Sequence, residues 1–129
     1  MPIHESAENY LETILVLSKR LGVVRSIDIA TDMNFSKPSV SIAMKNLRQE
    51  GHIEVQAGGS IVLTESGLAI AERIYERHCL IANMLIRLGV EESVAFDDAC
   101  KIEHHISPQS FDALKEFMRT YQPDAANKD

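Results

Sequence analysis

The sequence contains no apolar run that approaches the roughly 20 residues needed for a membrane-spanning helix. Its first residues, Met1 to Glu5, lack the basic segment followed by an apolar stretch that is typical of a secretory signal. Only two cysteines, Cys79 and Cys100, occur in 129 residues, which makes a poor disulfide scaffold for a chain with this much core material. These absences favour a cytoplasmic protein with free thiols and no membrane partner.

An excess of positive charge is also missing, because the formal net charge is −6. Since phosphate binding is driven by lysine and arginine, this charge argues against a protein that coats nucleic acid indiscriminately. The acid is concentrated in the second half: residues 1–63 carry six lysines and arginines against seven acids, and residues 64–129 carry seven against twelve. Residues 33–49 contain no acid at all. The basic residues of this stretch are Lys37, Lys45 and Arg48.

Length and composition allow one ordinary hydrophobic core or two small cores that share a long helix, because 45% of the residues are hydrophobic. Apolar residues recur at helical spacing over residues 7–21, and Gly22 is placed to end this helix in a left-handed conformation. Ser26 can cap a short helix that reaches about Met33.

The next segment predicts a second short helix after a tight turn. Asn34 and Phe35 form the turn, Ser36 caps the helix, and Pro38 is tolerated in its first turn. Gly51 ends the helix. Two short helices around a tight turn are the helix-turn-helix arrangement.

After this helix the apolar pattern changes from helical to alternating. Gly58-Gly59 is a strong hairpin signal because both positions can take positive φ. The facing apolar residues are Ile53 and Val55 on one strand and Ile61 and Leu63 on the other. The order of three helices and a hairpin predicts a winged helix-turn-helix DNA-binding domain over residues 1–63.

A second, all-helical domain is predicted over residues 64–129, so that the fold is mainly α. Thr64 can cap a long helix that runs to Leu88, where Gly89 closes it. An acidic helix follows over residues 91–106. Ser107-Pro108 then starts a last helix through Tyr121. Its predicted inward-facing residues are Phe111, Leu114, Phe117 and Met118.

The three helices of the second half carry more apolar surface than they can cover among themselves. We therefore expect a homodimer, with an internal three-helix core as the alternative interpretation of the same residues. A dimer would place two recognition helices about one DNA turn apart, roughly 34 Å.

Three residues of the acidic helix form a candidate metal site. Cys100, Glu103 and His104 stand at i, i+3 and i+4 and project from one helix face within reach of a single ion. A thiolate, a carboxylate and an imidazole suit Fe(II), Co(II), Ni(II) or Zn(II) better than Ca(II) or Mg(II), which prefer oxygen ligands. Taken alone, three polar residues on a helix are more often a solvated surface.

The order of elements, with Glu76-Arg77-His78 in the long helix and residues 97–107 in the acidic helix, resembles the diphtheria toxin repressor and manganese transport regulator family. The similarity covers about residues 5–121 and is to the short, two-domain kind without the SH3-like domain. The resemblance implies a metal-activated transcriptional repressor of metal-uptake genes. Its affinity for double-stranded operator DNA would rise when Fe(II) or Mn(II) binds at the junction of the domains, with Co(II), Ni(II) or Zn(II) as possible substitutes.

The resemblance also implies which side chains hold the metal. The matching positions are Glu12, His78, Cys100, Glu103 and His104. Asn9 matches a position that is aspartate in the manganese regulators and methionine in the iron regulators. Cys100 matches the iron type, whereas Glu103-His104-His105 occurs in the manganese type, so the chain is a hybrid. The second, ancillary site of the iron type is lost, since its ligand positions carry Ala82 and Phe96.

The DNA surface is expected at the start of the recognition helix, where short hydroxyls and a compact proline permit close approach to base edges. The candidate residues there are Ser36, Lys37, Pro38, Ser39 and Ser41. Ile42 is expected to contact a thymine methyl group. Arg25, Lys45 and Arg48 are candidates for phosphate contacts, which position a protein without reading sequence.

Two other functions use some of the same residues. Cys100-x-x-Glu103-His104 is superficially like the inverted zinc-peptidase pattern, but a cysteine replaces its first histidine and the chain leaves little room for a substrate cleft. We therefore expect neither an enzyme nor a small organic substrate. A winged-helix regulator that responds to a non-metal ligand is the other alternative, and metal content separates these possibilities.

Overall fold

The computed structural model describes residues 5–120, which form two compact units that divide between Tyr75 and Glu76. The division falls inside a single helix, α4 (Glu65–Arg87). Residues 1–4 and 121–129 lie outside the described part, and with them lies Tyr121, the predicted end of the last helix.

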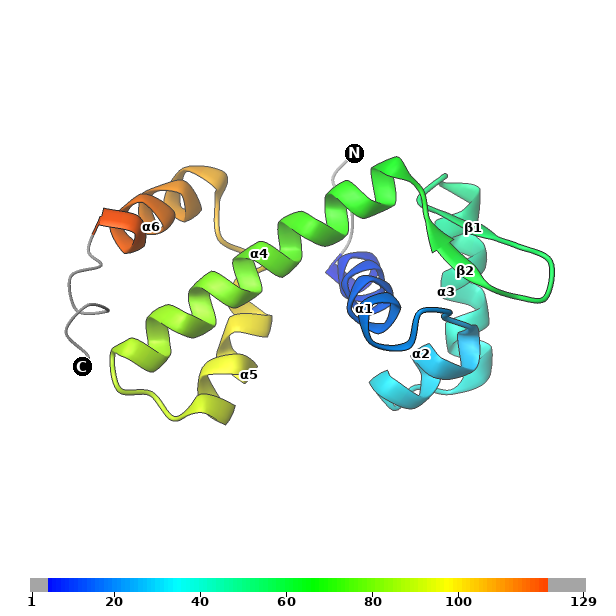
Figure 1. Cartoon of the computed structure of the whole chain (residues 1–129), viewed down its shortest axis with the longest axis horizontal. Coiled ribbons are helices and arrows are strands. Elements are labelled where there is room, and N and C mark those ends of the chain that lie inside the picture. Colours follow the sequence, from blue (N-terminus) through cyan, green and yellow to red (C-terminus); the bar gives the residue numbers. More distant parts are fainter. Residues whose placement is uncertain (1–4, 121–129) are drawn as a thin grey trace. The chain divides into compact units, whose positions relative to one another are not determined.

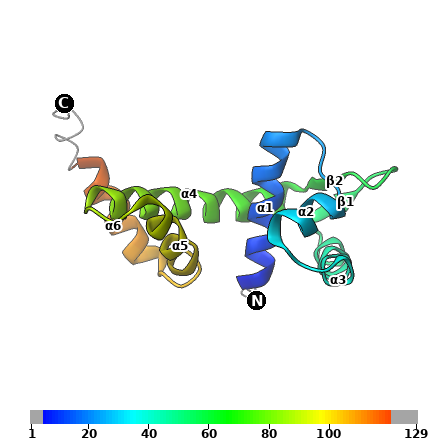
Figure 2. The same cartoon turned by 90° about the horizontal axis from the view of Figure 1, so that it is seen from below.

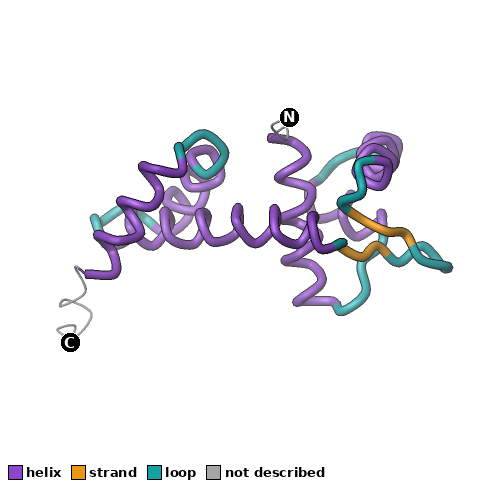
Figure 3. The backbone as a smooth tube through the Cα atoms, turned by 90° about the horizontal axis from the view of Figure 1, so that it is seen from above, coloured by secondary structure: helices purple, strands orange, loops and turns teal. Residues whose placement is uncertain are grey.

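The first unit is a winged helix-turn-helix, as predicted, and Figure 1 shows its three helices beside the hairpin. Its elements are α1 (Glu5–Leu21), α2 (Ser26–Met33), α3 (Lys37–Gln49), β1 (Ile53–Val55) and β2 (Ile61–Leu63). One apolar core joins them, with Leu11 and Ile14 of α1, Val40 of α3 and Ile53 of β1 all almost fully buried. Among the described residues, the strands are confined to the hairpin (Figure 3).

Local sequence signals account for the turns of this unit. Asn34 has φ of 58° and turns the chain between α2 and α3, where the Ser36 hydroxyl accepts a hydrogen bond from the Ser39 backbone N–H. The hairpin is antiparallel with Ile53 opposite Leu63, and both glycines of its loop, Gly58 and Gly59, have positive φ. The predicted strand pairing is therefore confirmed.

One cap was placed wrongly from the sequence. Ser26 is the first residue of α2 and not its cap, because Arg25 occupies the cap position in an extended conformation. The backbone N–H of Arg25 donates to the carboxylate of Asp28, 2.9 Å away. The hydrogen bond at the start of this helix is therefore accepted by a carboxylate in its first turn, and not by the serine hydroxyl.

The helix α4 (Glu65–Arg87) begins at the wing. The Thr64 hydroxyl accepts from the backbone N–H of Gly67 at 3.3 Å, which confirms the predicted cap. A Cβ atom built at Gly67 would lie 1.9 Å from the carbonyl oxygen of His52, so only glycine lets the start of α4 approach the end of the α3–β1 loop this closely.

The second unit contains the rest of α4, α5 (Glu92–Ile102) and α6 (Pro108–Thr120), and the two shorter helices flank the C-terminal part of α4 (Figures 1 and 2). Its small core contains Ile81 and Ala99. Phe111 of α6 is buried as predicted, whereas Phe117 is 53% exposed, which corrects its assignment to the inward face. Among the described residues, no helix is both long and apolar enough to cross a membrane.

The acidic helix is shorter than the sequence predicted. It ends at Ile102 and not at Ile106, and residues 103–106 form turns. Glu103 still has helical backbone angles and its N–H donates to the Ala99 carbonyl, so the spacing from Cys100 to Glu103 is preserved. His104 lies beyond the helix, which corrects the prediction that it shares one regular helix face with Cys100.

Candidate metal centre and nucleic-acid interface

Three side chains of the second unit converge on a candidate metal centre. His78 comes from α4, Cys100 from α5, and Glu103 from the residue that ends α5. One ligand atom of each lies within 4.8 Å of the others. Metal ions hold nitrogen, oxygen and sulfur ligands at about 2.0 to 2.3 Å, so atoms at these separations need only a small closure to share one ion.

Hydrogen bonding fixes the imidazole of His78 in this cluster. Its Nδ1 lies 2.9 Å from Oε1 of Glu103, and its ring stacks on Phe96 with 5.6 Å between the ring centres. Hydrogen bonds to Cys100 and Glu103 raise the pKa of His78 to about 10, against the opposite effect of burial. Without metal, the His78 imidazole therefore holds a proton within the cluster. A metal cation would bind to the same three groups.

The carboxylate of Glu103 is buried without full hydrogen bonding. Glu103 is fully buried, and its Oε2 has no hydrogen-bond partner among the described residues. Nε2 of His104 lies 3.3 Å from that oxygen without the geometry of a hydrogen bond, and the His104 side chain is almost fully buried. A buried, incompletely satisfied carboxylate costs free energy that a bound cation would offset. The donor set of nitrogen, sulfur and oxygen suits a divalent transition ion.

The structure thus brings together three of the side chains that the resemblance implied, with His104 beside Glu103. Asn9 and Glu12 lie on α1, in the first unit. The neighbouring carboxylate of Glu8 pairs with Arg73, at 3.2 Å.

Sequence reasoning missed Arg77, which contacts the turn that carries Glu103. Its Nη1 donates to the carbonyl oxygens of Glu103 and Ile106, at 3.1 and 2.9 Å. A signal was available in the sequence, because Arg77 stands three residues after Ile74 and four before Ile81 and is a charge within the apolar stripe of α4.

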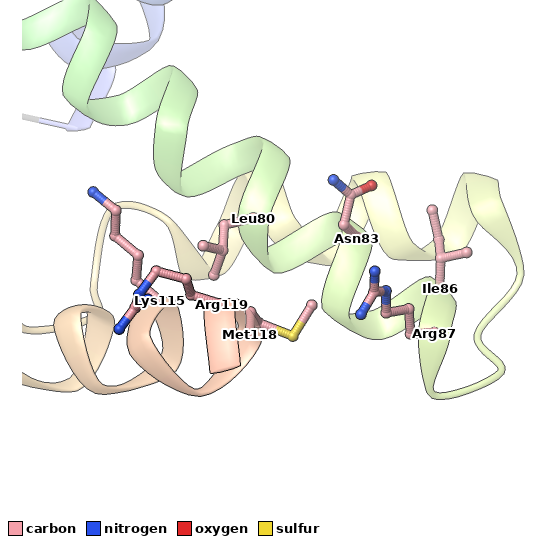
Figure 4. Close-up of a pocket in the computed structure, with 7 residues that line it drawn as sticks. All are labelled: Leu80, Asn83, Ile86, Arg87, Lys115, Met118 and Arg119. Atoms are coloured by element: carbon pink, nitrogen blue, oxygen red, sulfur yellow. The ribbon is translucent and has the colours of Figure 1, made fainter. Parts of the chain in front are cut away.

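The second unit also has a groove between α4 and α6, shown in Figure 4. Its lining residues are Leu80, Asn83, Ile86, Arg87, Lys115, Met118 and Arg119. None of these is a histidine, cysteine or acid, so the groove does not share the ligand chemistry of the metal cluster.

The candidate DNA residues form the exposed face of α3. The apolar face of this helix is buried through Val40, Met44 and Leu47. All the candidates on or beside α3 are exposed: Ser36, Lys37, Pro38, Ser39, Ser41, Ile42, Lys45 and Arg48. Ile42 is 62% exposed, so its apolar side chain is available for a contact outside its own unit.

The remaining candidate, Arg25, is joined to the wing. Its Nε donates to the carbonyl oxygen of Gly58 at 3.1 Å, and the Ile61 backbone N–H donates to the neighbouring Val24 carbonyl at 2.8 Å. The Arg25 side chain therefore presents its charge at the loop of a hairpin whose residues 53–63 include no lysine or arginine.

A winged helix-turn-helix with a basic recognition helix, followed by a helical unit with a metal-type ligand cluster, defines a class of metal-responsive DNA-binding regulators. The chain belongs to the iron-dependent repressor family. The family's N-terminal DNA-binding domain matches residues 3–60, and its metal-binding and dimerisation domain matches residues 64–128. The resemblance seen in the sequence is thereby confirmed.

Similarity to individual regulators supports this family membership. The chain is 33% identical over 117 residues to the transcriptional regulator MntR of Escherichia coli, covering 91% of this chain and 76% of that protein. It is 31% identical over 123 residues to MntR of Bacillus subtilis, covering 95% and 87%. The solved structure of the manganese regulator SloR has a TM-score of 0.78 at 28% identity over 92% of this chain, which spans 55% of that structure.

Proposed function

We propose that this protein is a metal-dependent transcriptional repressor that binds operator DNA when Fe(II) or Mn(II) occupies the cluster of His78, Cys100 and Glu103. The convergence of these three side chains from separate elements is the observation that carries the proposal. Family membership supports the DNA-binding and metal-binding roles of the two halves. The names of MntR and SloR support a regulatory role in metal homeostasis.

His78, Cys100 and Glu103 would hold the ion, and His104 would add a fourth donor beside Glu103. The bound ion would supply a positive charge that links these side chains in one arrangement. In the part of the proposal that rests on the sequence resemblance, Glu12 and Asn9 of α1 add further ligands. Co(II), Ni(II) and Zn(II) suit the same donor types and are expected to bind in vitro.

The exposed face of α3 would enter the major groove, with Ser39, Ser41 and Ile42 at base edges and Lys45 and Arg48 at phosphates. Homodimerisation through the second half would let two such helices read two half-sites of an operator. We place this activity in the cytoplasm, where reducing conditions keep the Cys100 thiol available.

Metal controls DNA affinity in this proposal through thermodynamic linkage. An ion that binds more tightly to the DNA-competent conformation shifts the protein toward that conformation, and DNA must tighten metal binding by the same factor. The protein therefore acts by binding, and we infer that it is not an enzyme.

Metal binding by anaerobically purified protein tests the proposal. Elemental analysis and titration with Mn(II), Fe(II) and Co(II) are expected to show stoichiometric binding that Glu103→Gln weakens. Arg119→Met serves as control, because Arg119 is an exposed residue of the same unit. This substitution is expected to leave metal binding unchanged. Wild-type protein that binds none of these ions would instead favour a regulator that responds to a non-metal ligand.

A further inference from the structure

Arg77 makes an unusual set of contacts for an arginine in the interior of a small unit. It lies on α4 next to His78 and is 6% exposed. One nitrogen, Nη1, donates to two backbone carbonyl oxygens, those of Glu103 and Ile106. The guanidinium also lies over the ring of Phe111, 5.4 Å from its centre.

The turn that Arg77 contacts lies directly after the end of a helix. Because α5 ends at Ile102, the carbonyl groups at its end have no partners within the helix. Backbone hydrogen bonds hold the near side of the turn, from the N–H of Glu103 to Ala99 and from the N–H groups of His105 and Ile106 to Ile102. Arg77 joins the carbonyl groups at the two ends of residues 103–106 through a single nitrogen.

Burial of this guanidinium costs free energy, which its contacts with the turn and with the Phe111 ring offset. Its Nε is buried and has no hydrogen-bond partner among the described residues. An apolar side chain between Ile74 and Ile81 would fill the same stripe of α4 without that cost. Such a side chain would leave the carbonyl groups of Glu103 and Ile106 without their donor.

We infer that Arg77 is a positioning residue of the metal centre, which fixes the turn of residues 103–106 so that the Glu103 carboxylate faces His78 and Cys100. This inference rests on the proposed function. The backbone of Cys100 is held by α5 and that of His78 by α4, so neither backbone position depends on the turn. Loss of Arg77 therefore acts on Glu103, and on His104 after it, while the thiolate stays in place.

Cobalt absorption separates these effects, because the thiolate-to-cobalt charge-transfer band reports Cys100 and the weaker d–d bands report the whole coordination geometry. Arg77→Met removes the donor while retaining a long side chain of good helix propensity. Arg77→Lys retains the charge and a donor nitrogen on a shorter side chain. Arg119→Met is the matched control, since the Arg119 side chain is largely exposed and pairs with Glu116 of its own helix.

Arg77→Met is expected to lower Co(II) affinity by about 10- to 100-fold, the usual loss when a group that orients a metal ligand is removed. The charge-transfer band is expected to persist while the d–d bands change, and Arg77→Lys is expected to restore part of both. If Arg77→Met does not fold, Arg77→Lys alone carries the test through its intermediate affinity and altered d–d bands.

Wild-type affinity and an unchanged cobalt spectrum in a folded Arg77→Met protein, or in Arg77→Lys where Met does not fold, would overturn the inference. A variant that is less stable to heat but binds Co(II) with wild-type affinity and spectrum would also overturn it, because Arg77 would then be only a packing residue. Failure of the wild-type protein to bind Co(II) would contradict the proposed function itself, so the two failures are distinguishable.

Discussion

Metal binding at His78, Cys100 and Glu103 is expected to weaken steeply as the pH falls. Without metal, hydrogen bonds to Cys100 and Glu103 raise the pKa of His78 to about 10, so its imidazole is protonated at neutral pH. A metal ion requires the neutral imidazole and must displace that proton. Each pH unit below the pKa then lowers the apparent affinity about tenfold, which is about 1.4 kcal/mol of binding free energy.

Between about pH 8 and about pH 6 the loss from His78 alone is therefore roughly 100-fold. Anaerobic titrations with Co(II) across this range measure the affinity, and calorimetry in buffers of different ionisation enthalpy counts the protons released. His105→Gln is the control, because His105 is exposed and outside the cluster, and it is expected to leave the slope unchanged.

The same pKa shift predicts the stability of the metal-free protein. Because the pKa of His78 is raised above its ordinary value of 6.5, the protonated imidazole stabilises the folded state fully below about pH 6.5. This contribution is lost as the pH rises toward 10. Metal affinity that is independent of pH, with no proton released on binding, would refute the protonated cluster on which both expectations depend.

Five further substitutions, at four positions, have expected outcomes. Cys100→Ala is expected to abolish metal activation without unfolding the protein, since Cys100 is exposed; full activation at ordinary metal concentrations would make it a non-ligand. Lys37→Glu is expected to prevent DNA binding with and without metal, and unchanged affinity would show that the DNA face is elsewhere. Arg25→Gln is expected to weaken DNA binding and to reduce the slope of log affinity against log salt by about 1, as for one lost phosphate contact; an unchanged slope would leave Arg25 only its bond to Gly58. Asn9→Asp is expected to shift activation toward Mn(II) and Asn9→Met toward Fe(II), measured by anaerobic DNA titrations, and superimposable metal profiles would remove Asn9 from the site.

Most of the fold followed from local sequence signals. Glycines, the Ser36 and Thr64 caps and the alternating strands act over a few residues, and each of these features is confirmed. The end of α5 did not follow, because residues 103–106 continue the helical pattern of polar and apolar residues. Arg77, on another helix, binds the carbonyl groups at the two ends of this segment, and such a long-range contact leaves no mark in the local pattern.

The metal cluster was predictable only in part for a similar reason. Cys100 and Glu103 lie close in sequence and could be paired from helical spacing, whereas His78 is separated from them by the last part of α4, a turn and most of α5. The position of His78 in the cluster depends on how α5 packs against α4, and the spacing of residues does not encode this packing. The family resemblance identified His78 as a ligand. The exposure of Phe117 differs from the prediction because a helical pattern identifies an apolar side chain but not what covers it.

Metal and DNA are expected to bind cooperatively, and DNA titrations with and without metal measure this coupling. A labelled duplex, enriched from a random-sequence pool by the Mn(II)-loaded protein, is titrated anaerobically with protein in the presence of Mn(II), of Fe(II) or of a chelator. Cooperative binding predicts that either metal tightens DNA binding by about 5- to 150-fold, a coupling of about 1 to 3 kcal/mol, and that the duplex tightens metal binding by the same factor. Equal DNA affinities with metal and with chelator would contradict it.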